Sequence, residues 1–94
     1  MVAKPAHPGR ILKREMAARD LSANALARAL RTPSGRIVDV VNGKRGVSPE
    51  TALRLARYFG NGPMFWLNLQ TVHELAVAEA AHGERIAAEV SPAA

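Results

Sequence analysis

The stretch that decides the fold is Leu21-Ser-Ala-Asn-Ala-Leu-Ala-Arg-Ala-Leu-Arg-Thr-Pro-Ser-Gly-Arg-Ile-Val-Asp-Val-Val-Asn-Gly-Lys-Arg45. Within this stretch, Ser22 is a good N-cap for one helix, and Thr32 followed by proline predicts the start of the next. Gly43 ends the later of these two helices, because glycine readily takes the left-handed conformation of a C-terminal cap. Two short helices with a tight turn between them predict a helix-turn-helix, whose second helix is presented to the major groove of DNA.

Helical patterns flank this unit on both sides and no strand pattern occurs, so we predict an all-α fold of five helices. A first helix is expected over residues 10–18, a fourth from Ser48-Pro49-Glu50 to Gly60, and a fifth from Met64 to about Ala80. The 94 residues make one domain, with its core at about 8–80 and the helix-turn-helix at about 22–43. Residues 83–94 are expected to form a weakly ordered C-terminal tail.

The formal net charge is +5 and is divided unevenly along the chain. Residues 1–57 hold twelve of the thirteen lysines and arginines and four of the eight acids, a balance of +8, whereas residues 58–94 carry −3. A basic half favours contact with a polyanion, although a charge excess also fits a plain solvated surface.

Several classes of protein do not fit the sequence. There is no cysteine for a disulfide or thiolate metal site, and no apolar run near the ~20 residues of a membrane span. The N-terminus lacks the apolar segment of a signal peptide, so we expect a cytoplasmic protein with no membrane partner. The three histidines are scattered and no phosphate-binding loop is present, so neither an enzyme nor a cofactor is predicted.

The second helix of the unit carries the candidate base contacts. The Ser34 hydroxyl and the Arg36 guanidinium can bond to base edges, Arg36 equally to a phosphate, and Val38 suits a thymine methyl group. Asp39 can accept from cytosine, but its favoured role is to pair with Arg36 three residues earlier. Gly35 shares this outward face and adds no side chain, so we expect modest specificity, aided by dimerisation and DNA shape. The candidate phosphate contacts are Asn24, Gly43, Lys44 and Arg45.

The predicted fifth helix is apolar over more of its circumference than a surface helix needs. One face can pack on the other helices, and the excess favours a second buried face against a partner chain, hence a homodimer. The alternative is a helix that is buried entirely in the core of its own chain. The dimer candidates are Phe65, Trp66, Asn68, Leu69, Gln70 and Val72.

Five segments of the chain resemble the HigA antitoxins, helix-turn-helix proteins of the Xre/Cro (lambda-repressor-like) type that include proteins called virulence-associated protein I. They are His7-Pro-Gly-Arg-Ile-Leu12, Leu21-Ser-Ala-Asn-Ala-Leu-Ala27, Asn42-Gly-Lys-Arg-Gly46, Thr51-Ala-Leu-Arg-Leu-Ala-Arg-Tyr-Phe-Gly60 and Trp66-Leu-Asn-Leu-Gln70. The last segment is the specific part, because a bare helix-turn-helix is common.

The resemblance implies a five-helix domain that dimerises mainly through its C-terminal portion and represses its own operon by binding a palindromic operator. It also implies a HigB-like toxin as protein partner, an mRNA-cleaving RNase of the RelE type that is neutralised by direct contact. It places Trp66, Asn68 and Gln70 in the core of the fifth helix and in the dimer contact. The two amides either reach a partner's backbone, which we favour, or are merely exposed. The implied DNA contacts are Ser34, Arg36, Asp39, Asn42, Lys44 and Arg45.

Some residues depart from the family's pattern and leave other functions open. The family often has serine at the position of Gly35 and asparagine at that of Val38, so two DNA contacts are lost. Arg31 occupies a turn position that often carries glycine, and an arginine at positive φ is strained. One alternative is a solitary Xre-family transcriptional regulator with no toxin partner. Another is a protein-interaction module whose basic face no longer binds DNA specifically.

Overall fold

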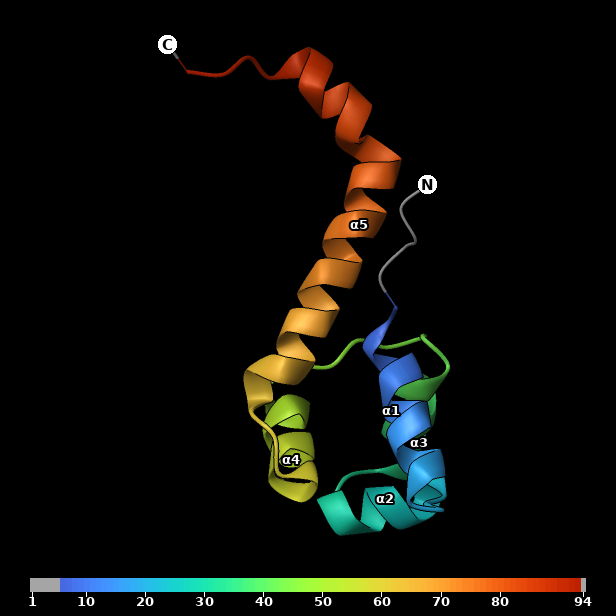
Figure 1. Ribbon diagram of the computed structural model, residues 1–94. Coiled ribbons are helices and arrows are strands. Elements are labelled where there is room, and N and C mark those ends of the chain that lie inside the picture. Colours follow the sequence, from blue (N-terminus) through green and yellow to red (C-terminus); the bar gives the residue numbers. More distant parts are fainter. Residues whose placement is uncertain (1–5, 94) are drawn as a thin grey trace.

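The computed structural model describes residues 6–93, and these form five α-helices with no strand among them (Figure 1). Helices α1 to α4 make a compact body, and α5 contacts α4 and then projects away from this body. The predicted all-α class and helix number are confirmed. The helices are α1 (Pro8–Ala18), α2 (Ala23–Leu30), α3 (Ser34–Val41), α4 (Pro49–Phe59) and α5 (Pro63–Glu89).

Two of the predicted N-caps are confirmed by their hydrogen bonds. The backbone N–H of Ala25 donates to Ser22 Oγ at 3.1 Å, and that of Thr51 donates to Ser48 Oγ at 3.2 Å. Gly60 ends α4 with a left-handed φ of 77°. These short-range signals therefore locate the helices as predicted.

The start of α3 differs from the prediction by one residue. Pro33 occupies the N-cap position and makes no side-chain cap, so Thr32 is not the cap of this helix. Arg31 instead adopts the left-handed conformation at φ 58°, and the N–H of Thr32 donates to the Ala27 carbonyl at 3.0 Å. The Thr32 backbone is therefore used at the end of α2, and Pro33 is the residue that precedes α3 at its N-cap position.

The left-handed turn after α2 is held by an arginine from α4, a contact that no local pattern predicts. Nη1 of Arg54 donates to the Leu30 carbonyl at 2.8 Å and lies 3.4 Å from that of Arg31. Carbonyls at a helix C-terminus lack intrahelical donors and attract cations. Arg54 therefore fixes the turn of the helix-turn-helix against α4.

We expect Arg54→Met to lower the free energy of unfolding by about 1–2 kcal/mol, because it leaves the end of α2 without its charged donor. Urea denaturation followed by circular dichroism measures the loss. Arg57→Met is the matched control, since Arg57 is exposed on the same helix. Equal midpoints for the two variants would contradict a role for Arg54 at the turn.

The core lies where α1 to α5 meet. Its largest wholly buried side chains include Leu12, Leu26, Ile37, Leu55 and Trp66. Trp66 has no exposed surface and donates from its indole Nε1 to Asn61 Oδ1 at 3.1 Å. The predicted place of Trp66 in the core is confirmed, whereas its predicted place in the dimer contact is wrong, because the side chain has no exposed surface for a partner.

One close approach between helices sets the position of α3. A Cβ atom built on Gly9 of α1 would lie only 1.9 Å from the backbone carbonyl oxygen of Val40 in α3. Gly9 and the Val40 side chain are both buried at this crossing. Only a residue without a side chain fits here, so Gly9 fixes the distance between α1 and α3.

The fifth helix is longer than predicted. It continues without interruption through Gly83 to Glu89, so the expected weakly ordered tail is wrong for residues 83–89. A single glycine costs a helix only about 1 kcal/mol relative to alanine, and the surrounding segment is rich in alanine. Arg85 and Glu89 also pair at 3.8 Å, one turn apart. None of the helices in the described part of the chain is long and apolar enough to cross a membrane.

His7 caps α1 in a way that depends on its protonation state. The N–H of Gly9 donates to His7 Nδ1 at 2.9 Å, and the His7 ring meets the His73 ring of α5 edge-on at 5.0 Å. Burial, together with His73, lowers the pKa of His7 below 6.5, while Glu74 acts in the opposite direction. A protonated Nδ1 cannot accept the cap hydrogen bond.

We expect the domain to lose stability as the pH falls, because the unfolded chain protonates His7 more readily than the folded one. The contribution of His7 is complete above pH 6.5 and is lost as the pH falls through its lower native pKa. Denaturation midpoints at about pH 7.5 and about pH 5.5 measure this. His7→Asn keeps an acceptor that does not titrate, so its midpoint should change less. An identical pH dependence in both proteins would contradict the role of His7.

Candidate nucleic-acid interface

The outer side of α3 is a continuous exposed surface. Ile37 and Val40 bury the inner side of the helix completely. Ser34, Gly35 and Val38 lie exposed on the other sides, and 41% of Val38 is accessible. The structure therefore leaves the predicted base contacts of α3 accessible, as a recognition helix requires.

The loop after α3 extends this surface with cations. Gly43 takes a φ of 74°, and the N–H groups of Lys44 and Arg45 donate to the Asp39 carbonyl at 2.8 and 3.2 Å. The chain thus folds back on the last turn of α3, with Asn42, Lys44 and Arg45 exposed. Asn24, the remaining predicted contact, is exposed in the first turn of α2.

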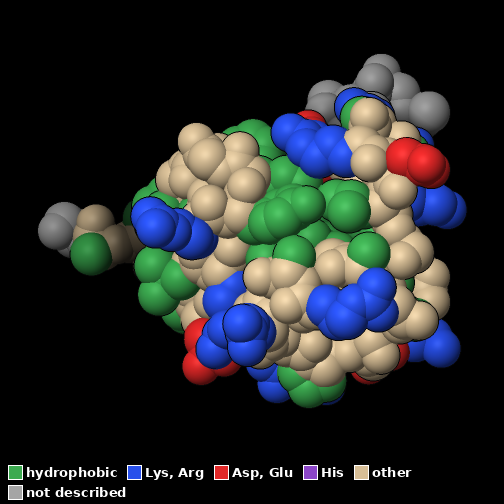
Figure 2. All heavy atoms as spheres, turned by 90° about the horizontal axis from the view of Figure 1, so that it is seen from below, with side chains coloured by type: hydrophobic (Ala, Val, Ile, Leu, Met, Phe, Trp, Pro, Cys, Tyr) green, Lys and Arg blue, Asp and Glu red, His purple; other side chains and the backbone are tan. Residues whose placement is uncertain are grey.

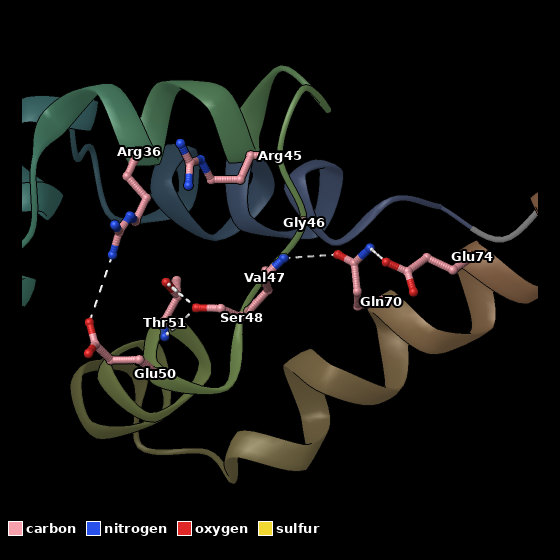
Figure 3. Close-up of a pocket in the computed structure, with 9 residues that line it drawn as sticks. All are labelled: Arg36, Arg45, Gly46, Val47, Ser48, Glu50, Thr51, Gln70 and Glu74. Carbon is pink, nitrogen blue, oxygen red and sulfur yellow. Dashed lines mark hydrogen bonds and ion pairs between the residues drawn. The ribbon is translucent and has the colours of Figure 1, made fainter.

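The ion pairs of α3 differ from the prediction. Asp39 does not pair with Arg36; its carboxylate lies 4.0 Å from Arg45 Nε. Arg36 points instead toward α4, where its Nη1 lies 3.8 Å from Glu50 Oε1 (Figure 3). The prediction is wrong because it considered only neighbours within α3, whereas acids elsewhere in the fold compete for the same arginine.

Basic side chains also surround the end of the molecule that α2 forms. Figure 2 shows them around an apolar area, and they are more numerous there than acidic side chains. A hollow lies between α2 and α4, lined by Ala29, Leu30, Leu53, Arg54, Arg57 and Tyr58. Positive charge is therefore not confined to α3, so charge alone does not delimit the interface.

A polar cavity of about 500 Å³ lies between α3, the following loop, α4 and α5 (Figure 3). Within it, Gln70 of α5 accepts a hydrogen bond from the N–H of Val47 at 3.0 Å. The amide was predicted to reach a partner's backbone, but the backbone group that it bonds belongs to its own chain, so that prediction is wrong. No cluster of acids and histidines able to hold a metal occurs among residues 6–93.

The other dimer candidates keep accessible surface. Phe65 and Val72 are 44% and 51% exposed, Asn68 is exposed, and Leu69 is half-buried. The helix continues this apolar surface farther than the predicted set, through Leu75 to Ile86, which are 58% and 51% exposed. Ile86 was missed because the helix was predicted to end near Ala80, whereas Leu75 lay inside the predicted helix and was left out of the dimer candidates.

Comparison with known proteins identifies this architecture. A family model described as a helix-turn-helix domain matches residues 9–63. A HigA-family addiction module antidote protein from Coxiella burnetii superimposes with a TM-score of 0.94 at 43% identity, covering 97% of this chain and 100% of that one. The chain belongs to the HigA family of helix-turn-helix antitoxins.

Further relatives of the HigA family agree. Antitoxin HigA of Pseudomonas aeruginosa, solved with the higBA promoter, has a TM-score of 0.92 at 44% identity, over 96% of this chain and 99% of that one. Virulence-associated protein I of Dichelobacter nodosus is 49% identical over 74 residues, which are 78% of this chain and 68% of that protein. Some curated relatives are named only as uncharacterised helix-turn-helix transcriptional regulators. The relatives are DNA-binding antitoxins and regulators, not enzymes.

Proposed function

We propose that this protein binds the operator of its own operon as a dimer, represses transcription, and neutralises a RelE-type mRNA-cleaving toxin by direct contact. The observation that carries the DNA-binding half is the exposed side of α3, continuous with the cations of the following loop. The P. aeruginosa HigA was solved with promoter DNA, which supports the same role here. A repressor of its own operon acts in the cytoplasm.

The candidate DNA contacts on α2, α3 and the loop after α3 divide into two kinds. Ser34, Val38 and Asn42 reach base edges through a hydroxyl, an apolar group and an amide, while Gly35 lets the helix backbone approach the groove closely. Lys44, Arg45, Asn24 and the backbone at Gly43 contact phosphates, which positions the helix without reading sequence. Asp39 orients Arg45, the cation that it faces.

We expect Arg36→Ala and Lys44→Ala to weaken DNA binding in different ways. Arg36 must leave Glu50 to read a base, and its loss should then reduce discrimination between operator and scrambled DNA by about 1–3 kcal/mol. Lys44→Ala should weaken both duplexes equally and lower the salt slope by about 1. Fluorescence anisotropy with the two duplexes measures both effects. Equal losses on both sequences for Arg36→Ala would remove its base-reading role.

The proposed dimer uses the exposed apolar side of α5. Phe65, Val72 and Leu75 lie on the free side of the helix and are 44–58% exposed. Apolar side chains in such numbers on one surface are characteristic of an interaction site. A two-fold dimer has two copies of α3, as a palindromic operator has two half-sites.

The toxin half of the proposal is tested with the short reading frame next to the gene. If expression of the neighbour alone arrests growth, and this protein both restores growth and copurifies with it, the antitoxin role stands. A harmless neighbour that does not bind would favour the alternative of a solitary Xre-family regulator. The relatives named only as transcriptional regulators give that alternative its support.

A further inference from the structure

Gln70 is one of only two polar residues buried among the described residues, and both ends of its amide are engaged. Its Oε1 accepts from the N–H of Val47 at 3.0 Å, and its Nε2 donates to Glu74 Oε1 at 2.6 Å (Figure 3). A buried amide with both groups satisfied has one orientation, because rotating it exchanges donor and acceptor. The amide therefore holds the Val47 backbone at a fixed place on α5.

The segment next to Val47 packs directly on the same amide. A Cβ atom built on Gly46 would lie 2.8 Å from both Cδ and Nε2 of Gln70, so the backbone at Gly46 lies against the amide. The Val47 side chain is 5% exposed and belongs to the core. Gly46 and Val47 are thus fixed to α5, whereas Lys44 and Arg45 are fixed to α3 through the Asp39 carbonyl.

We propose that Gln70 is a positioning residue for DNA binding: it fixes the loop after α3 to α5 and so orients Lys44 and Arg45 toward phosphates. This inference rests on the proposed function. The loop between α3 and α4 is anchored at its start by α3 and near its end by this amide. Without the second anchor the two cations keep their charge but sample more positions. Each phosphate contact then requires a larger loss of conformational entropy in the loop.

The test compares Gln70→Leu with a rescue variant that combines Gln70→Glu with Glu74→Gln. In the rescue variant the introduced carboxylate accepts from Val47, and the introduced amide at position 74 donates to that carboxylate. Both hydrogen bonds are restored with the charge moved by one turn. Trp66→Phe is the stability control, because it weakens the core on the same helix away from the loop. Gly46→Ala is a second route to the same defect, since its methyl group displaces the amide.

Binding to a duplex of its own promoter is measured by anisotropy at several salt concentrations, with exchange of the Val47 amide hydrogen followed in parallel. We expect Gln70→Leu and Gly46→Ala to bind about tenfold more weakly with a salt slope lower by about 1–2, which marks lost phosphate contacts. The rescue variant should return to within about threefold of the wild type. Trp66→Phe should leave the salt slope unchanged.

Two results would overturn the inference alone. One is a wild-type affinity and salt slope in Gln70→Leu. The other is a loss in Trp66→Phe that matches Gln70→Leu in both quantities, because the effect would then come from stability. A wild-type protein that fails to bind the promoter duplex at low salt would overturn the proposed function, and this inference with it.

Discussion

Gly9→Ala is expected to cause a large loss of stability. The added methyl group would lie 1.9 Å from the Val40 carbonyl oxygen, which is backbone inside α3 and cannot rotate away. Either α1 separates from α3 or α3 bends, and both displace buried side chains such as Leu12 and Ile37. Because overpacking of a core costs about 1–3 kcal/mol and occasionally more, we expect about 3 kcal/mol here.

Denaturant unfolding of Gly9→Ala is best compared with Gly35→Ala. A Cβ atom on Gly35 meets nothing within 4 Å, so this variant makes the same chemical change at an open helical site. Alanine is favoured over glycine in helices, and Gly35→Ala should therefore be neutral or slightly stabilising. A loss below about 1 kcal/mol for Gly9→Ala would show that α1 and α3 are not held at this distance.

Trp66→Ala is expected to cost about 3–5 kcal/mol, the range for removing a large aromatic side chain from a core. The ring has no exposed surface and packs beside Phe59, at 5.8 Å between ring centroids. Its indole N–H also bonds to Asn61. The variant should therefore unfold at a much lower denaturant concentration than the wild type when both are compared at the same protein concentration.

Sedimentation separates this core role from a role at a dimer interface. Leu75→Glu introduces a charge on the exposed side of α5, where Leu75 is 58% accessible. It should shift a dimer toward monomer while each monomer keeps its fold. A folded, monomeric Trp66→Ala protein of nearly unchanged stability would contradict the core assignment and return Trp66 to the interface.

The features that the sequence predicts correctly depend on neighbours within a few residues. Ser22 and Ser48 cap their helices through N–H groups three residues later, and Gly43 and Gly60 take the left-handed conformation. The exposed positions of α3 follow from the spacing of Ile37 and Val40, which identifies the buried side of the helix. Such local signals also place the candidate DNA contacts on accessible surface.

The features that the sequence does not predict depend on distant parts of the chain. Arg54 reaches Leu30 across 24 residues, and Gln70 reaches Val47 across 23. Arg36 has an acid nearby in sequence, yet it pairs with Glu50 because the fold brings α4 to its side. The sequence shows which side chains can donate or accept a hydrogen bond, but packing decides which partner each one meets. The partners of these three residues were therefore predicted wrongly or not at all.

The most direct test of operator binding through α3 is a salt titration of the purified protein with a duplex of its own promoter and with a scrambled duplex of the same composition. We predict tighter binding to the promoter at every salt concentration. For both duplexes the affinity should fall steeply with salt, with the slope of a protein that neutralises about 6–10 phosphates. Equal affinity for the two sequences, or an affinity that does not change with salt, would contradict the account.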